Sequence, residues 1–239
     1  MPPSASRGGI TSELWEYRWL LLQGTGMTLV LGLTGLVLSL LIGLIGSAAK
    51  IGGGRVAQRI AGGYTTFVRS VPDLCMMLLL FFGGQTLLNK LGAATGWWEN
   101  FDVNAFAAGV ITIAFIFGAY MTETFRGAYT SIPVGQFEAA MAIGMTRGQM
   151  FRLITFPQLM GYAIPSIGVN WMVLLKTTAL VSVIGLHDLV FFGVSAGRST
   201  RNPFTFLIAI MAIYLVLTAG SEWVLARAER RYTKGRARA

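Results

Sequence analysis

Residues 20–49, LLLQGTGMTLVLGLTGLVLSLLIGLIGSAA, decide the fold of this chain, because these 30 residues include no charged side chain. As a helix, the segment would be about 45 Å long at ~1.5 Å per residue, whereas the hydrocarbon core of a bilayer is ~30 Å thick. We therefore expect a transmembrane helix here, with its first turns outside the core and the span itself at about 26–49.

The residues just before this span form a short mixed segment. Between positions 12 and 20, the charged residues Glu13, Glu16 and Arg18 alternate with Trp15 and Trp19. Indole rings prefer the boundary between lipid and water, and charged side chains keep a helix at that boundary. The pattern predicts an interfacial helix over residues 12–20.

Four further apolar stretches follow, and the composition excludes a soluble class. The chain is 54% hydrophobic and 12% charged, whereas a soluble domain is roughly a quarter charged. We predict an all-α polytopic membrane protein, one domain over residues 1–239, with five transmembrane helices at about 26–49, 69–90, 103–123, 157–180 and 203–225. The second charge-free stretch is short, so its crossing must include Asp73 or extend beyond residue 89. The fourth is expected to be long, or interrupted near Lys176.

The distribution of basic residues orients the chain. Its formal charge is +9, but the basic residues form short clusters between apolar stretches, without the basic stripe and interleaved aromatics of a nucleic-acid-binding protein. The segments after the first, third and fifth spans hold 13 lysines and arginines, against 5 on the other side. By the positive-inside rule, we expect the N-terminus outside, the C-terminus in the cytoplasm, and residues 127–156 as a cytoplasmic loop.

This loop has the start and stop residues of a small helical corner. Ser131 followed by Pro133 favours a helix start, and Gly144 favours a helix end. Thr146, with Gln149 three residues later, has the spacing of a capping box that starts a second helix. The sequence predicts a short helix, a tight turn and another helix.

The predicted corner carries bulky apolar side chains at Phe137, Met141 and Met145, which water alone would not favour. One interpretation is that a partner protein docks on them. The other is that the loop packs beneath its own bundle.

The loop also contains a recognisable motif. Glu138-Ala139-Ala140, three residues, Gly144, nine residues, Ile154, two residues and Pro157 resemble the EAA loop of ABC importer permeases, although Phe156 stands where the family usually has leucine. The stretches YTTFVRSVPDL (64–74), GAYMTETFRG (118–127) and NWMVLLKTTALVSVIGL (170–186) resemble the polar amino acid permeases. The likeness covers residues 24–234 and is strongest to Q-type subunits of histidine/lysine/arginine/ornithine and opine importers.

This resemblance implies a type I ABC importer permease fold in a bacterial inner membrane, surrounded by lipid. It implies three protein partners: a cytoplasmic ABC ATPase homodimer, a sister permease of the M type, and a periplasmic amino-acid-binding protein. The chain has no GxxxxGK[ST] phosphate loop, so ATP hydrolysis is expected from the partner, and neither enzymatic activity nor a cofactor is expected. Seven residues are expected to contact the ATPase: Phe137, Glu138, Ala139, Ala140, Gly144, Met145 and Arg147.

Three ionisable residues in or near the spans are candidates for the substrate path, since charges inside a membrane are costly. Glu123 either helps to pass a cationic substrate or pairs with Arg126 three residues later. Lys176 either extends towards the interface or forms part of the conformational change. Asp73 either contacts a cationic substrate or simply starts a helix after Pro72.

Other functions remain as alternatives. His187 and Asp188 are too few ligands for a metal site. A stand-alone secondary transporter would need related halves or a self-sufficient bundle, which five unrepeated spans do not supply. A membrane enzyme would need a His/Asp/Glu constellation, which the sequence lacks. The substrate stays open among basic amino acids, opines, and neutral or acidic amino acids.

Overall fold

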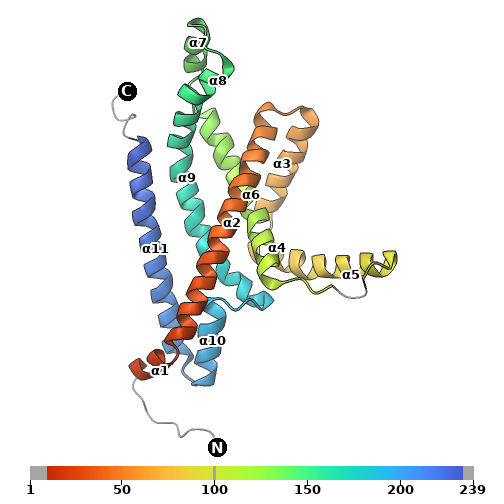
Figure 1. Ribbon diagram of the computed structural model, residues 1–239, viewed down its shortest axis with the longest axis vertical. Helices are drawn as coiled ribbons and strands as arrows, with labels where there is room; N and C mark the ends of the chain where they lie inside the picture. Colours follow the sequence, from red (N-terminus) through yellow and green to blue (C-terminus); the bar gives the residue numbers. More distant parts are fainter. Residues whose placement is uncertain (1–9, 99–100, 234–239) are drawn as a thin grey trace, which may run out of the picture.

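The computed structural model describes residues 10–98 and 101–233, and within these ranges the chain is helical without a strand. Figure 1 shows long helices running between two ends of an elongated molecule. The elements are α1 (Ile10–Glu16), α2 (Arg18–Gly52), α3 (Arg55–Ser70), α4 (Asp73–Leu78), the π-helical turn η1 (Leu79–Gly83), α5 (Gly84–Thr95), α6 (Ala105–Thr130), α7 (Val134–Ala142), α8 (Arg147–Met150), the π-helical turn η2 (Phe151–Thr155), α9 (Phe156–Thr177), the 3-10 helix η3 (Thr178–Ile184), α10 (Leu189–Ser199) and α11 (Pro203–Thr233).

Five of the described helical stretches are long and apolar enough to cross a membrane, which confirms the predicted number of spans. They are Arg18–Gly52, Asp73–Thr95, Ala105–Thr130, Arg147–Ile184 and Pro203–Arg230. The fourth stretch changes character after Lys176, as expected, because α9 ends at Thr177 and the chain continues as the 3-10 helix η3. The α1 end of the chain and the end of α11 lie at opposite ends of the molecule (Figure 1).

The predicted interfacial helix at 12–20 is divided in the structure. Helix α1 ends at Glu16, Tyr17 bends the backbone with φ −90° and ψ 5°, and α2 starts at Arg18. The bend keeps its hydrogen bonds, because the Tyr17 N–H still donates to the Glu13 carbonyl at 3.2 Å. The first spanning helix is therefore one unbroken helix from Arg18 to Gly52.

The predicted second span at 69–90 needs a correction, because the chain bends near its start. The pyrrolidine ring of Pro72 disfavours a helical conformation for the residue before it. Val71 is accordingly extended, with φ −102° and ψ 137°, and separates α3 from α4. Beyond η1, helix α5 runs across the direction of the other long helices (Figure 1). The apolar stretch is therefore not a straight crossing.

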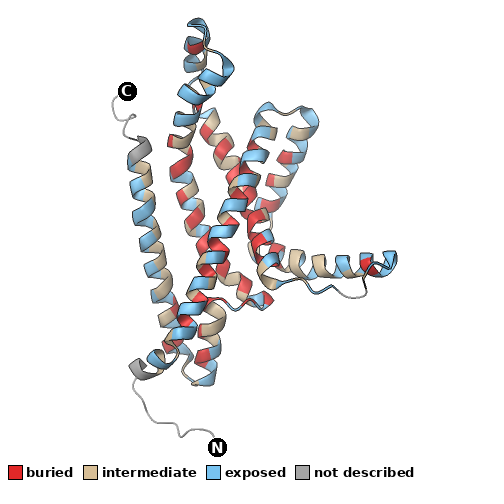
Figure 2. Ribbon diagram, in the orientation of Figure 1, coloured by how far each residue is buried: buried red, intermediate tan, exposed pale blue. Residues whose placement is uncertain are grey.

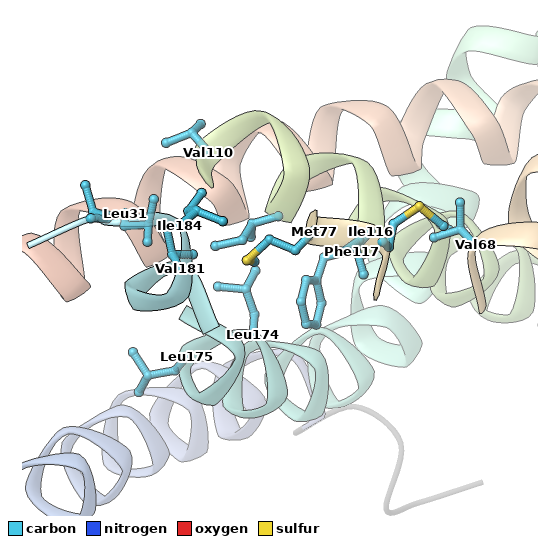
Figure 3. Packing of buried hydrophobic residues seen from close by; sticks show 14 of the residues in the cluster. Leu31, Val68, Met77, Val110, Ile116, Phe117, Leu174, Leu175, Val181 and Ile184 are labelled. Atoms are coloured by element: carbon cyan, nitrogen blue, oxygen red, sulfur yellow. The ribbon is translucent and has the colours of Figure 1, made fainter. Parts of the chain in front are cut away.

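The core lies where α2, α6 and α9 meet, as the buried positions in Figure 2 show. Leu31, Ile113, Phe117 and Leu174 are at most 1% exposed and belong to one hydrophobic cluster. Figure 3 shows Phe117 and Leu174 side by side in this cluster, with Met77 of α4 beside them. Close packing of this kind holds α6 at the centre of the bundle.

Gly43 lets α2 approach α6 closely. A Cβ at this position would lie 2.9 Å from the backbone carbonyl carbon of Met121, a separation that real Cβ atoms essentially never show. Small residues at helix crossings allow backbones to come together in membrane proteins. The contact brings the C-terminal half of α2 close to α6, which also places Lys50, at the end of α2, beside α6.

Candidate functional site

The predicted helical corner is present at one end of the bundle, the same end at which α11 finishes (Figure 1). Helix α7 starts directly after Pro133, whose φ of −59° suits a helix start. The helix ends at Ala142, and after a four-residue link α8 starts at Arg147. The predicted helix, turn and second helix are confirmed.

The turn between the two helices depends on Gly144. Its φ is +75°, in the left-handed region that favours glycine. The Met145 N–H donates to the Ala140 carbonyl at 3.0 Å and the Gly144 N–H to the Met141 carbonyl at 3.0 Å. These two bonds form a Schellman motif, which satisfies carbonyl groups at the end of α7 and gives the turn one defined shape.

The predicted capping box at the start of α8 is also confirmed. The Gln149 N–H donates to the Thr146 hydroxyl at 3.4 Å, and the Thr146 N–H donates to Oε1 of Gln149 at 2.9 Å. This reciprocal pair satisfies two backbone donors at a helix start. The corner is therefore fixed on both sides of Gly144.

Two contacts attach the corner to the spanning helices. The ring of Phe137 packs against Tyr129 of α6, with centroids 5.9 Å apart. The Gln158 side chain of α9 donates a hydrogen bond to Gln136 of α7. A displacement of α7 would therefore act on both α6 and α9.

The seven residues predicted to contact an ATPase do not share one face. Glu138, Ala139, Gly144 and Arg147 are exposed, and Phe137 and Met145 are half-buried. Ala140 is 1% exposed, so its prediction as a surface contact was wrong, because this side of α7 faces the rest of the chain. Ile143, which was not among the seven predicted contacts, is 73% exposed, and its place just before the glycine stop was visible in the sequence.

A second feature is a polar pocket between α2, α3 and α6. Its volume is about 500 Å³, which is within the range of small-molecule sites. The side chains that line it are Lys50, Thr65, Thr66, Arg69, Ser70, Tyr120 and Glu123. It combines charged and hydroxyl groups inside an otherwise apolar bundle.

Glu123 is the centre of a charge cluster beside this pocket. Its Oε2 pairs with Arg126 at 2.8 Å, which confirms the predicted local ion pair. Its Oε1 pairs with Lys50, which also donates to the Thr65 hydroxyl at 2.6 Å. Lys50 was missed as a site residue, because at the end of an apolar stretch it looks like a topology charge. The indication in the sequence was Glu123 itself, because a carboxylate in or near a membrane span needs a positively charged partner.

Arg69 and Asp73 lie on either side of the break at Pro72. The Arg69 guanidinium lies 5.5 Å from the ring centroid of Tyr120, and the Asp73 carboxylate interacts electrostatically with the same tyrosine. Neither Arg69 nor Asp73 forms an ion pair with a residue in the described ranges. Asp73 is the first residue of α4, as one interpretation proposed, and its contact with a cationic substrate stays a prediction.

Lys176 is exposed in the last turn of α9, and no described contact joins it to Asp73 or Glu123. A lysine at a helix C-terminus also interacts favourably with the helix dipole. Among residues 10–98 and 101–233, no three His, Cys, Asp or Glu side chains gather in a group that could hold a metal ion.

Comparisons with known proteins agree with this geometry. The profile of the family described as "binding-protein-dependent transport system inner membrane component" matches residues 35–234. The chain is 50% identical to the histidine/lysine/arginine/ornithine transport system permease protein HisQ of Escherichia coli, over 95% of this chain and 99% of that protein. It is 35% identical to the octopine transport system permease protein OccQ of Rhizobium radiobacter, over 95% of each chain.

Solved structures give the same fold. One chain of the crystal structure of an amino acid ABC transporter with histidines superposes with a TM-score of 0.82 at 30% identity, over 95% of this chain and 100% of that one. A chain of the MetNI methionine ABC transporter in an inward-facing conformation superposes with a TM-score of 0.69 at 19% identity, over 91% and 98% of the two chains. The second likeness concerns the fold alone.

Proposed function

This chain belongs to the family of binding-protein-dependent transport system inner membrane components, and we propose that it carries basic amino acids across the membrane. It is an ABC importer permease of the inner membrane. The single observation behind the substrate class is the 50% identity to the histidine/lysine/arginine/ornithine permease over nearly the full length of both chains.

The corner at Gly144 is proposed as the docking element for an ATPase. It is rigid, because a Schellman motif and a capping box fix it, and it presents Glu138, Ala139 and Ile143 to the surroundings. It is attached to α6 through Phe137. Closure of an ATPase dimer would thus move spanning helices as rigid bodies.

The polar pocket is proposed as part of the substrate path. An amino acid carries a carboxylate and an ammonium group, and a basic one carries a second cation. Arg69 is an arginine without a carboxylate partner in the described ranges, which suits a substrate carboxylate. Glu123 and Asp73 are the acidic groups in this region, and their carboxylates would attract the cationic groups of the substrate. Lys176, which is exposed away from these contacts, is proposed to act only in the conformational change.

Three partners follow from the importer class: an ATPase homodimer beneath the corner, a second permease chain of the M type, and a binding protein that delivers the amino acid outside. In this proposal the N-terminal side faces the periplasm and the Gly144 corner faces the cytoplasm. The excess of basic residues in the segments on the corner side supports that orientation.

The test is ATP hydrolysis by the reconstituted complex, measured with its binding protein and a panel of lysine, arginine, ornithine, histidine, octopine and glutamate. Stimulation by the first four with no response to glutamate is the expected result. A response to octopine alone would move the proposal to the opine importers, which the 35% identity to OccQ supports. Transport by the chain without an ATPase would refute the importer assignment.

A further inference from the structure

Helix α5 projects sideways from the bundle. The long helices α2, α6, α9 and α11 run lengthwise through the molecule, whereas α5 runs across their direction (Figure 1). Among the described elements, α5 makes its main contacts with η1, the turn that directly precedes it. Gly92 is its buried residue, and the rest of the helix is exposed or half-buried (Figure 2). The structure therefore leaves most of the surface of α5 uncovered.

The twelve residues of α5 divide into an apolar and a polar side. Leu87, Leu88 and Leu91 lie on one side, because positions three and four apart are neighbours on a helix. These three leucines are 59%, 37% and 49% exposed. The polar side chains lie around the other sides: Gln85, Thr86, Asn89 and Lys90. An exposed apolar side of this kind is unfavourable in water.

The segment that leads from α5 to α6 covers part of the polar side. The Phe101 N–H donates a hydrogen bond to Oδ1 of Asn89 at 2.8 Å. The Trp98 indole N–H donates to the Leu88 carbonyl at 3.2 Å, and the indole ring packs against Gly92. These contacts fix the rotation of α5 about its own axis. The leucine side consequently faces away from the connecting segment.

The segment that precedes α5 is long enough to cross the membrane by itself. Helices α3 and α4 and the turn η1 have 16, 6 and 5 residues. At ~1.5 Å per residue they give a path of about 40 Å, whereas the hydrocarbon core is ~30 Å thick. Helix α6, which follows α5, runs from Ala105 back to the end at which the Gly144 corner lies (Figure 1). Helix α5 thus joins two crossings at their ends away from the corner.

Two side chains indicate what covers the leucine side. Lys90, three residues after Leu87, flanks that side, is exposed and forms no ion pair with a residue in the described ranges. Trp97, just beyond the end of α5, is 80% exposed. Lysine is depleted in the cores of protein–protein interfaces, whereas lysine and tryptophan both suit the boundary between lipid and water. The phosphate groups of lipids supply the negative charge that Lys90 lacks within the chain.

We propose that α5 lies flat at the boundary between lipid and water, on the side of the membrane away from the Gly144 corner, and that phospholipid covers its leucine side. The three leucines enter the acyl region, and the Lys90 ammonium group binds headgroup phosphates. The second crossing then consists of α3, α4 and η1, and α5 anchors the end of this crossing to the membrane surface. This placement does not depend on which substrate the protein carries.

Spin labels on single cysteines measure the depth of α5 in the membrane. The complete complex is reconstituted into vesicles of phosphatidylethanolamine and phosphatidylglycerol, in a Cys75→Ser background because Cys75 is exposed. Collisions of each label with oxygen, which concentrates among acyl chains, and with a nickel chelate dissolved in water give its depth. Leu87→Cys and Ala94→Cys lie on one side of α5, about 10 Å apart along the helix. They should have equal depths, because α5 lies in the membrane plane.

The matched control is on a helix that crosses the membrane. Val30→Cys and Val37→Cys have the same separation along α2, and both valines are exposed. Their depths should differ by about 10 Å. On the polar side of α5, Thr86→Cys should collide with the nickel chelate more than with oxygen. Lys90→Glu should move the label at Leu87 towards water, because phosphate repels a carboxylate, whereas Lys90→Arg should leave the label in place.

Three results would overturn the proposal. Depths at Leu87 and Ala94 that differ as the depths on α2 do would mean that α5 crosses the membrane. Labels that oxygen does not reach would mean that water or a protein, such as the sister permease, covers the leucines. A label at Leu87 that stays in place in Lys90→Glu would rule out the headgroup contact. Leu91→Cys, on the same side, repeats the oxygen measurement, so the outcome does not depend on one variant.

Discussion

Replacing Gly144 by alanine is expected to weaken docking of the ATPase without disturbing the membrane bundle. Gly144 has a φ of +75°, and nothing lies within 4 Å of the place where a Cβ would be. The new methyl group therefore meets no neighbour, and its whole effect is on the backbone. An alanine in the left-handed region costs about 1–2 kcal/mol.

This cost can be converted into a change in affinity. If docking requires the turn that Gly144 permits, the variant must adopt the strained conformation on binding. Since ~1.4 kcal/mol corresponds to a factor of ten, the ATPase should bind roughly five- to thirty-fold more weakly. Asparagine tolerates the left-handed region better, so Gly144→Asn should lose less than Gly144→Ala.

The assay is titration of purified ATPase subunit onto membranes that contain the permease, with substrate-stimulated hydrolysis measured in parallel. Gly148→Ala is the matched control, because Gly148 lies in α8 with equal space around it and a negative φ. Gly148→Ala should bind the ATPase as the parent does, because alanine has a higher helix propensity than glycine. Equal affinities for Gly144→Ala and Gly148→Ala would refute the reasoning.

Three further changes probe the bundle and the pocket. Gly43→Ala should destabilise the protein by about 1–3 kcal/mol, measured by thermal unfolding, because it overpacks the crossing of α2 and α6. Lys50→Met and Glu123→Gln should show a coupling energy of about 1–2 kcal/mol in a double-mutant cycle. This value lies between those of surface and buried ion pairs, because the side chains of Lys50 and Glu123 are 14% and 19% exposed. Arg69→Gln should raise the KM for arginine uptake roughly 10- to 150-fold, because it removes a charged hydrogen bond of about 1.5–3 kcal/mol.

Controls for these changes come from the same helices. Gly26 lies on α2 with no atom near its Cβ position, so Gly26→Ala should leave unfolding unchanged. Arg59 is exposed on α3 and does not line the pocket, so Arg59→Gln should keep the parental KM. A loss of stability in Gly26→Ala equal to that in Gly43→Ala would contradict the crossing argument. Purely additive effects at Lys50 and Glu123 would contradict their pairing.

The features that could be predicted from the sequence are local ones. A capping box involves Thr146 and Gln149, which are three residues apart, and the glycine stop at Gly144 is a single position. The five spans follow from runs of apolar residues, and each run can be recognised in the sequence without knowledge of the rest of the fold. The pair between Glu123 and Arg126 is likewise local, because both lie on one helix.

What could not be predicted depends on how distant segments pack. Lys50 and Glu123 are 73 positions apart and meet only because α2 crosses α6. Ala139 and Ala140 are separated by about 100° around a helix, so their exposures can differ, and the docking of α7 on the bundle decides that Ala140 is the one that is buried. The direction of α5 is set after the bend at Pro72, and hydrophobicity alone carries no information on direction.

Helix α6 links the two candidate functional features mechanically. Glu123, beside the polar pocket, lies six residues before Tyr129, which holds the corner, a distance of about 9 Å along the helix. If α7 is pulled, α6 moves with it. The bond from Glu123 to Arg126 survives, because both residues are on α6, whereas the bond to Lys50 spans two helices. Movement of α6 relative to α2 would therefore break only the Lys50 pair and leave one oxygen of Glu123 free for a cationic substrate. A crosslink that joins α2 to α6 at this level should accordingly block transport while ATP still binds.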